Sequence, residues 1–232
     1  MTTRRKRPGK GRRLALIGAS AAVVAAGAVV TPQAFAGTLF GGASTAAAAC
    51  SDVELVFARG TGEPQGLGIV GRPLARELAA ELPDLTVGSF AVVYAAAGNQ
   101  RSAGPGATNM SRHIAEVAAA CPDTRFVIGG YSQGASVTDI AIGIRGAGTR
   151  GETIPAALAG RVAAVVVFGN PLGLQRRTIA GSSAVFGPKA KEFCNTGDPV
   201  CGGGGNFAAH LAYPRNGSVQ RAAEFAAGKV TG

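Results

Sequence analysis

The residue best suited to covalent chemistry is Ser132, within the pentapeptide Gly130-Tyr131-Ser132-Gln133-Gly134. This G-x-S-x-G pattern follows a run of β-branched residues and precedes a stretch of helical character, which is the context of a nucleophile elbow. Such a sharp strand-to-helix turn has no room for side chains two residues either side of the nucleophile, and glycines at 130 and 134 remove them. The pattern alone is also compatible with a tight turn that carries a solvated serine, but its placement favours the elbow.

A serine hydroxyl becomes nucleophilic only beside a base, and the base needs a carboxylate that orients it. In folds with this elbow the chain order is serine, acid, histidine. The sequence has two histidines, and only His210 follows Ser132. The other, His113, stands upstream in a helical stretch, and we expect it to be a solvated surface residue. The predicted base is His210.

Position also selects the acid. The acidic residues after the serine are Asp139, Glu152, Glu192, Asp198 and Glu224. Residue 139 is too far down the elbow helix to reach the strand ends, residue 152 falls in a loop before the next strand, and residue 224 follows the histidine. Of the remaining two, Asp198 lies after the last strand and between Cys194 and Cys201. A short disulfide loop there would hold the carboxylate in place, so we favour Asp198 over Glu192.

Two alternating kinds of segment predict the fold that positions these residues. Runs rich in β-branched residues occur at 52–58, 85–94, 124–130 and 162–169, with helical stretches at 71–82, 108–120, 133–145 and 219–227. The run at 162–169 is apolar on both faces, as in a central strand of a parallel sheet. The alternation predicts a three-layer α/β/α sandwich around a mostly parallel sheet of about five strands.

The N-terminal segment has the features of an export signal. Seven basic residues stand between positions 4 and 13, an uncharged run extends from 14 to 30, and Ala34-Phe35-Ala36 offers a cleavage site. We expect 1–36 to be a secretory signal peptide, 37–49 a flexible leader and 50–232 the catalytic domain of a secreted, extracellular protein. A stable transmembrane anchor is the alternative, although a run of about 17 residues is at the short limit for spanning a bilayer.

Most of the positive charge belongs to this export segment. The whole chain carries +10, from 23 Lys and Arg against 13 Asp and Glu. Cleavage after residue 36 leaves 16 basic and 13 acidic residues, a net charge of +3. The high isoelectric point therefore does not argue for nucleic-acid binding.

Four cysteines remain after the predicted cleavage, namely Cys50, Cys121, Cys194 and Cys201. An even number in an exported chain indicates two disulfides, and three pairings are possible. The last two cysteines are separated by turn-forming residues and are able to close a local loop. Bacterial lipidation of Cys50 is disfavoured, because leucine is absent from the third position before it. A metal site is disfavoured because no histidine has zinc-finger spacing, and we expect no cofactor.

Four stretches in a fixed order make the chain resemble the cutinase family, especially the cutinase-like proteins of actinobacteria. They are Phe57–Glu63, Gly129–Ala135, Phe193–Cys201 and His210–Tyr213, and together they span nearly all of residues 50–232. The resemblance implies disulfides Cys50–Cys121 and Cys194–Cys201. It also implies a catalytic triad of Ser132, Asp198 and His210.

The resemblance further implies an oxyanion hole and an open site. The backbone N–H groups of Thr61 and Gln133 would form the hole, with the Thr61 hydroxyl, usually a serine in the family, as a third donor. Family members generally lack a large lid, so the site should admit bulky or polymeric esters. Phe207 and Leu211 flank His210 and are candidates for an acyl-binding wall, a role for which ordinary loop packing is an equal alternative. The stretch 95–108 departs from the fungal members, and Asn99 is a candidate support for the hole.

These features predict a secreted serine carboxylic ester hydrolase that acts on cutin-like polyesters or lipid esters through a covalent acyl-enzyme. An acyltransferase with the same triad is one alternative, and phospholipase or triacylglycerol lipase activity is another. A non-catalytic envelope-binding protein is disfavoured by the intact set of catalytic residues. We expect a monomer whose partner is the ester substrate, with no stable membrane anchor after signal cleavage.

Overall fold

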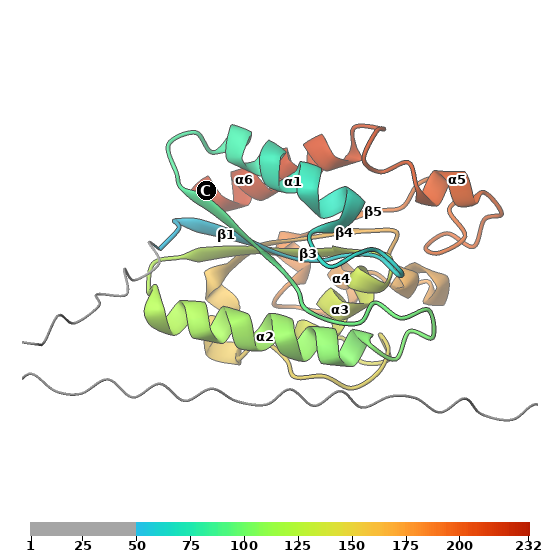
Figure 1. Cartoon of the computed structure of the whole chain (residues 1–232), viewed down its shortest axis with the longest axis horizontal. Helices are drawn as coiled ribbons and strands as arrows, with labels where there is room; N and C mark the ends of the chain where they lie inside the picture. Colours follow the sequence, from blue (N-terminus) through green and yellow to red (C-terminus); the bar gives the residue numbers. More distant parts are fainter. Residues whose placement is uncertain (1–49) are drawn as a thin grey trace, which may run out of the picture. The chain divides into compact units, whose positions relative to one another are not determined.

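The centre of the fold is a sheet of five parallel strands (Figure 1). The computed structural model describes residues 50–232, so the predicted signal peptide 1–36 and leader 37–49 lie outside the described part. The strands are β1 (Val53–Ala58), β2 (Val87–Ala91), β3 (Arg125–Tyr131), β4 (Val162–Phe168) and β5 (Ala190–Phe193), in the spatial order β2-β1-β3-β4-β5. Every residue of β4 is buried, as its uniformly apolar sequence predicts.

Helices cover both faces of the sheet, which confirms the predicted three-layer sandwich. Figure 1 shows α1 (Gly68–Glu81) and α6 (Ser218–Thr231) on one face and α2 (Ala103–Ala120) and α3 (Gln133–Ala141) on the other. The shorter elements are η1 (Ala156–Arg161), η2 (Pro171–Gln175), α4 (Ile179–Ser182), η3 (Gly187–Lys189) and α5 (Phe207–His210).

Alternate residues of each strand supply the two halves of the core. On β1, Leu55 and Phe57 pack with α1 and α6, whereas Val56 packs with α2 and α3. Neighbouring side chains of a strand point to opposite faces, so a strand between two helical layers must be apolar throughout. Burying one such aliphatic side chain stabilises the fold by about 1.5–3 kcal/mol. The strand ends that carry the loops are therefore rigidly held.

Some element boundaries differ from the sequence prediction. Helix α2 begins at Ala103, whereas the sequence predicted a start at 108. The prediction missed the first turn because Gly104, Pro105 and Gly106 are untypical of helices. Helix α3 ends at Ala141 rather than at 145, since the chain turns at Gly143 with φ 81°. Strand β2 is shorter than predicted, and α1 and α6 are longer.

Two disulfides fasten opposite ends of the sheet. Cys50–Cys121 joins the segment before β1 to the end of α2, and Cys194–Cys201 closes the loop after β5. Both pairs are those that the resemblance implied. Because all five strands are parallel, the first bridge lies at the amino edge of the sheet and the second at the carboxyl edge.

The strand order defines where a ligand is expected. Strands β1 and β3 are neighbours although β2 lies between them in the sequence. In open parallel sheets, ligands bind at the carboxyl edge where the strand order changes direction in this way. The loops that follow β1 and β3 therefore flank the expected site.

Candidate active site

Ser132 occupies a sharp turn between β3 and α3, with φ 56° and ψ −118°. A non-glycine residue at positive φ costs on the order of 1–3 kcal/mol, so its surroundings must enforce the conformation. A Cβ atom at Gly130 would lie 2.0 Å from the Gly134 carbonyl oxygen, and one at Gly134 would lie 1.9 Å from that of Ala58. The predicted need for glycine at both positions is confirmed. The Ser132 N–H donates to the Phe168 carbonyl (2.9 Å), which ties the turn to β4.

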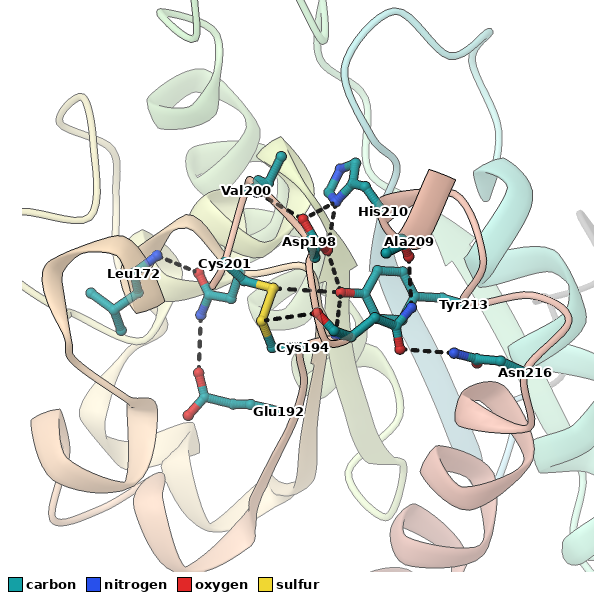
Figure 2. Close-up of a disulfide and its surroundings, with 12 residues drawn as sticks. Leu172, Glu192, Cys194, Asp198, Val200, Cys201, Ala209, His210, Tyr213 and Asn216 are labelled. Carbon is teal, nitrogen blue, oxygen red and sulfur yellow. Dashed lines mark hydrogen bonds and ion pairs between the residues drawn. A yellow bond between two sulfur atoms is a disulfide. The ribbon is translucent and has the colours of Figure 1, made fainter. Parts of the chain in front are cut away.

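Asp198 and His210 form a buried pair beyond the ends of β4 and β5 (Figure 2). Asp198 is fully buried and His210 is 3% exposed. The Nδ1 atom of His210 lies 2.9 Å from Oδ2 of Asp198. Space for the ring comes from Gly169 at the end of β4, where a Cβ atom would lie 2.7 Å from Cε1 of His210. The carboxylate lies within the Cys194–Cys201 loop, as the sequence indicated.

Two aromatic rings flank the His210 imidazole. The Tyr131 ring stacks on it at a centroid distance of 4.9 Å, and the Tyr131 hydroxyl donates to the His210 carbonyl oxygen (2.9 Å). The Phe207 ring lies 5.4 Å away on a tilted plane. These contacts restrict rotation of the imidazole, whose Nδ1 atom lies against Asp198.

The Asp198 carboxylate accepts hydrogen bonds from two further groups. The Val200 N–H donates to Oδ1 (2.7 Å) and the Tyr213 hydroxyl donates to Oδ2 (2.5 Å). Burial and the hydrogen bond to Asp198 raise the pKa of Tyr213, so its phenol is a neutral donor. The sequence analysis gave Tyr213 no role. The available signal was its place in the stretch His210–Tyr213.

The competing acids lie elsewhere. Glu192 accepts hydrogen bonds from the Asn170 side chain (3.2 Å) and the Ile179 N–H (2.8 Å). Asp139 is buried inside α3, where its Oδ1 atom contacts the same Asn170 amide (3.3 Å). Burial raises the pKa of both carboxyl groups, that of Asp139 to about 8. The structure thus puts Asp198, and neither of these acids, beside His210.

Thr61 and Gln133 lie where the chain leaves β1 and β3. Gln133 is the first residue of α3, so its backbone N–H lacks a partner within the helix. Among residues 50–232, no protein group accepts a hydrogen bond from the N–H of either residue. The Thr61 loop is held by Glu63, whose carboxylate accepts from the N–H groups of Gly60 (2.5 Å) and Ile69 (2.7 Å). Both N–H groups are therefore available to a ligand beside Ser132.

Gln100, rather than Asn99, contacts Thr61. Its Nε2 atom donates to the Thr61 hydroxyl (3.1 Å), whereas the Asn99 side chain accepts from the Arg101 N–H within its own loop. The same loop is tied to α3, because the buried Gln133 side chain donates to the Ala97 carbonyl (3.0 Å). The sequence offered Asn99 as the candidate in this stretch, whereas the residue that contacts Thr61 is Gln100.

A cavity of about 760 Å³ opens above Ser132 and His210. Thr61, Ser132 and His210 line it together with apolar side chains. Its apolar wall includes four large hydrophobic side chains that remain exposed to solvent: Ile69, Leu174, Phe207 and Leu211. Phe207 is 57% and Leu211 41% exposed.

His113 is not the solvated surface residue that we expected. Its ring stacks on Phe90 at a centroid distance of 3.5 Å, and its Nε2 atom lies 3.1 Å from the Glu54 carboxylate. The side chain is 17% exposed. The expectation was wrong because residue 113 lies on the face of α2 that packs against the sheet, a direction set by the packing of the helix.

Within residues 50–232, no cluster of three or more His, Cys, Asp or Glu side chains is arranged to hold a metal ion. In the same part of the chain, no helix has the length and apolar character needed to cross a membrane.

The parallel sheet, the serine elbow and the buried acid–histidine pair define an α/β hydrolase. A protein-family model described as cutinase matches residues 49–230. The chain belongs to the cutinase family.

The chain is similar to several proteins whose names state an activity. A protein from Kineococcus radiotolerans named cutinase is 63% identical over 186 residues, which are 79% of this chain and 63% of that protein's length. Phospholipase Culp4 of Mycobacterium tuberculosis is 40% identical over 228 residues, 97% of this chain and 96% of that protein. Among solved structures, a Trichoderma reesei cutinase bound to a phosphonate inhibitor matches with TM-score 0.63 and 31% identity, covering 78% of this chain and 77% of that chain. The family and these relatives support carboxylic ester hydrolysis as the class of reaction.

Proposed function

We propose that the chain is a serine carboxylic ester hydrolase in which Ser132 is the nucleophile, His210 the general base and Asp198 the orienting acid. One observation carries the proposal: a strained serine and a histidine with a buried carboxylate partner line the same cavity. A histidine whose Nδ1–H donates to a carboxylate presents Nε2 as the base.

The chemistry proceeds in two balanced halves. His210 Nε2 takes the proton of the Ser132 hydroxyl while the oxygen attacks the ester carbonyl, and the same proton then passes to the departing alcohol. Water repeats the sequence on the acyl-enzyme and releases the carboxylic acid. The N–H groups of Thr61 and Gln133 are proposed to bind the oxyanion, with the Thr61 hydroxyl as third donor. Removing one such donor typically costs about 10²–10³ in kcat.

Phe207 and Leu211 are proposed to contact the acyl chain. They are exposed, line the cavity and flank the base. The solvent-exposed apolar wall of the cavity supports esters that are bulky, polymeric or presented at a lipid surface. Kinetics with p-nitrophenyl esters of increasing chain length test this role. Replacing both residues with Ser should lower kcat/KM for the long-chain esters much more than for the acetate ester. An equal decrease for all esters would contradict the proposed acyl contact.

The nucleophile is tested by covalent labelling. A phosphonate ester should add one group to the intact protein, and peptide mass spectrometry should find it on Ser132. Ser132→Ala should lose the label and several orders of magnitude in kcat with an unchanged fold. The matched variant is Ser136→Ala, because Ser136 lines the same cavity and should not be labelled. Label on Ser136, or activity that survives Ser132→Ala, would refute the assignment.

A second candidate reaction is hydrolysis of phospholipid esters, which a groove beside the cavity favours. The groove has a volume of about 390 Å³, shares Glu63 and Ile69 with the cavity, and is lined by Arg72 and Arg76. Both arginines are exposed, and neither forms an ion pair within residues 50–232. The acidic residue of the groove, Glu63, already accepts a backbone hydrogen bond at each of its oxygens. The charged donors that remain for a phosphate are the two arginines.

The two substrate classes are separated by one double variant. Arg72→Gln with Arg76→Gln should lower kcat/KM for a phosphatidylglycerol substrate about tenfold while leaving a neutral triacylglycerol unchanged. The control is Lys191→Gln, an exposed basic residue that lines neither the cavity nor the groove. Equal effects on both lipids would reject the phospholipid candidate. Acyl transfer with the same triad is distinguished by product analysis with and without an acceptor alcohol.

We further propose that the protein acts outside the cell as a monomer, without nucleic acid or a membrane anchor. The two disulfides and the basic, apolar N-terminal segment support export. Sequencing the N-terminus of protein from the culture medium should find it near Gly37. Retention of residues 1–36 in the membrane fraction would favour the anchor instead, and light scattering reports the oligomeric state.

A further inference from the structure

A tyrosine hydroxyl shares the triad carboxylate with the histidine. Figure 2 shows the Tyr213 phenol and the His210 imidazole meeting at Asp198 from different sides. The Tyr213 hydroxyl donates to Oδ2 at 2.5 Å, the oxygen that also lies 2.9 Å from His210 Nδ1. Tyr213 has no exposed surface and lies three residues after the base.

The phenol is itself part of a directed chain. Its oxygen accepts a hydrogen bond from the Asn195 N–H (3.1 Å), which strengthens the hydroxyl as a donor to Asp198. Asn195 is further fixed because its side-chain amide donates to the Ala209 carbonyl (2.7 Å). The relay therefore joins the first residue after the Cys194 half-cystine to the acid, next to the segment that carries the base.

The surroundings make this donor important. Asp198 is fully buried, and within residues 50–232 its only charged partner is His210. The other titratable groups near the pair are Tyr131, which stacks on the imidazole, and Glu63 in the cavity wall. A buried carboxylate stays ionised only when hydrogen bonds or a counter-charge replace water, and each hydrogen bond to it favours the ionised form.

We propose that Tyr213 is a positioning residue of the triad, which by donating to Asp198 keeps the carboxylate ionised and fixes its angle toward His210, so that it sets the acid limb of the pH–rate profile. This inference rests on the proposed function. Packing alone would require only the ring, which lies edge-on to Phe168 at 5.8 Å and to Tyr131 at 6.0 Å. The hydrogen bond to the carboxylate requires the hydroxyl.

The test replaces the hydroxyl and keeps the ring. Tyr213→Phe should move the midpoint of the acid limb of kcat/KM to higher pH by about 1–2 units, which is the shift that the loss of a hydrogen bond to a charged group corresponds to. The sign follows from the ion pair: a carboxylate that loses a donor binds the imidazolium proton more strongly and is itself protonated more easily. In either case the imidazole–carboxylate pair takes up its first proton at a higher pH, and the arrangement of neutral base and ionised acid is lost there. Well below both midpoints the variant should lose about 10–100-fold in kcat/KM.

Tyr94→Phe is the matched control. The Tyr94 hydroxyl is also buried and also makes a 2.5 Å hydrogen bond, but to the carbonyl oxygen of Arg59. Its removal should lower stability by a similar amount without moving the acid limb. If both variants leave the midpoint in place, or move it equally, the inference is wrong.

A second variant covers the case in which Tyr213→Phe does not fold. Site-specific 3-fluorotyrosine at position 213 keeps the ring and makes the phenol a stronger donor, so the acid limb should move to lower pH. A midpoint that does not move would overturn the inference. The low-field proton NMR signal of the His210 Nδ1–H is read without substrate, and it should change in Tyr213→Phe but not in Tyr94→Phe. That signal tests the inference even if labelling of Ser132 fails, which would instead refute the proposed function.

Discussion

The two disulfides are predicted to rank in opposite order for stability and for activity. Cys194–Cys201 closes a separation of 7 residues and Cys50–Cys121 one of 71. In the loop-entropy treatment, removing the first lowers the free energy of unfolding by about 2.5 kcal/mol and removing the second by about 4.4 kcal/mol. Replacing both members of each pair with Ala therefore should destabilise the protein more when the long loop is opened.

Activity should respond in the reverse order because the short bridge encloses the acid. Asp198 lies inside that loop, and its backbone carbonyl accepts from the N–H groups of Gly202 (3.0 Å) and Gly204 (3.3 Å). The glycine segment toward His210 is thus fastened to the loop that the disulfide closes. A displacement of about 1 Å in a catalytic group can cost 10²-fold in rate. The Cys50–Cys121 bridge lies at the opposite edge of the sheet, and neither cysteine lines the cavity.

The assay compares both double variants with the wild type at a temperature where circular dichroism finds all three folded. We expect kcat/KM to fall by about 10²-fold for the Cys194→Ala, Cys201→Ala protein and by less than about threefold for Cys50→Ala, Cys121→Ala. Urea unfolding supplies the stability order. If the short-loop variant keeps wild-type activity, the backbone hydrogen bonds alone hold the acid, and the reasoning fails.

Two further predictions concern buried positions. Gly134→Ala should lower kcat by more than about tenfold and destabilise the fold by about 1–3 kcal/mol, since its Cβ atom would lie 1.9 Å from the Ala58 carbonyl oxygen; Gly160→Ala, with nothing within 4 Å, should do neither. Urea unfolding and ester kinetics measure both, and equal effects would contradict the steric argument. Burial raises the pKa of Asp139 to about 8, so the folded state keeps a proton that the unfolded chain releases near pH 4, and stability should fall as pH rises between these values. Asp139→Asn should make stability less dependent on pH and raise the free energy of unfolding at pH 8 by at least about 1 kcal/mol. Parallel curves of melting temperature against pH for the variant and the wild type would contradict this prediction.

Local patterns predicted the fold and the geometry of the elbow. The alternation of apolar strands and helices is a property of short segments, and it gave the layers, since each strand buries both faces. The two glycines around Ser132 are likewise a local steric requirement. Chain order then selected Asp198 and His210, which the structure brings together, although their catalytic roles stay predictions.

Long-range side-chain contacts could not be predicted in this way. Gln100 reaches Thr61 from 39 residues away, and it does so from a backbone conformation with φ 62° that no hydrophobic pattern encodes. The direction of His113 depends on how α2 rotates against the sheet. Tyr213 lies in the stretch His210–Tyr213 that resembles the family. Its hydrogen bond to Asp198, however, depends on how the chain folds back onto the Cys194–Cys201 loop. Each missed contact joins loops whose paths are set by tertiary packing.

The site combines fixed chemical groups with an exposed wall, and the two should therefore vary independently. Ser132 lies in a turn that requires glycine at 130 and 134. Asp198 lies in a cystine loop and is contacted by three hydrogen-bonding groups, from Val200, His210 and Tyr213. By contrast, Leu174, Phe207 and Leu211 are more than 40% exposed and are free to change without altering the core. If the proposed roles hold, we expect substitutions in this wall to change which ester is bound, and substitutions in the held groups to change whether any ester reacts. Differences in substrate between this chain and its relatives are accordingly expected to map to the wall and to the neighbouring arginine groove, not to the triad.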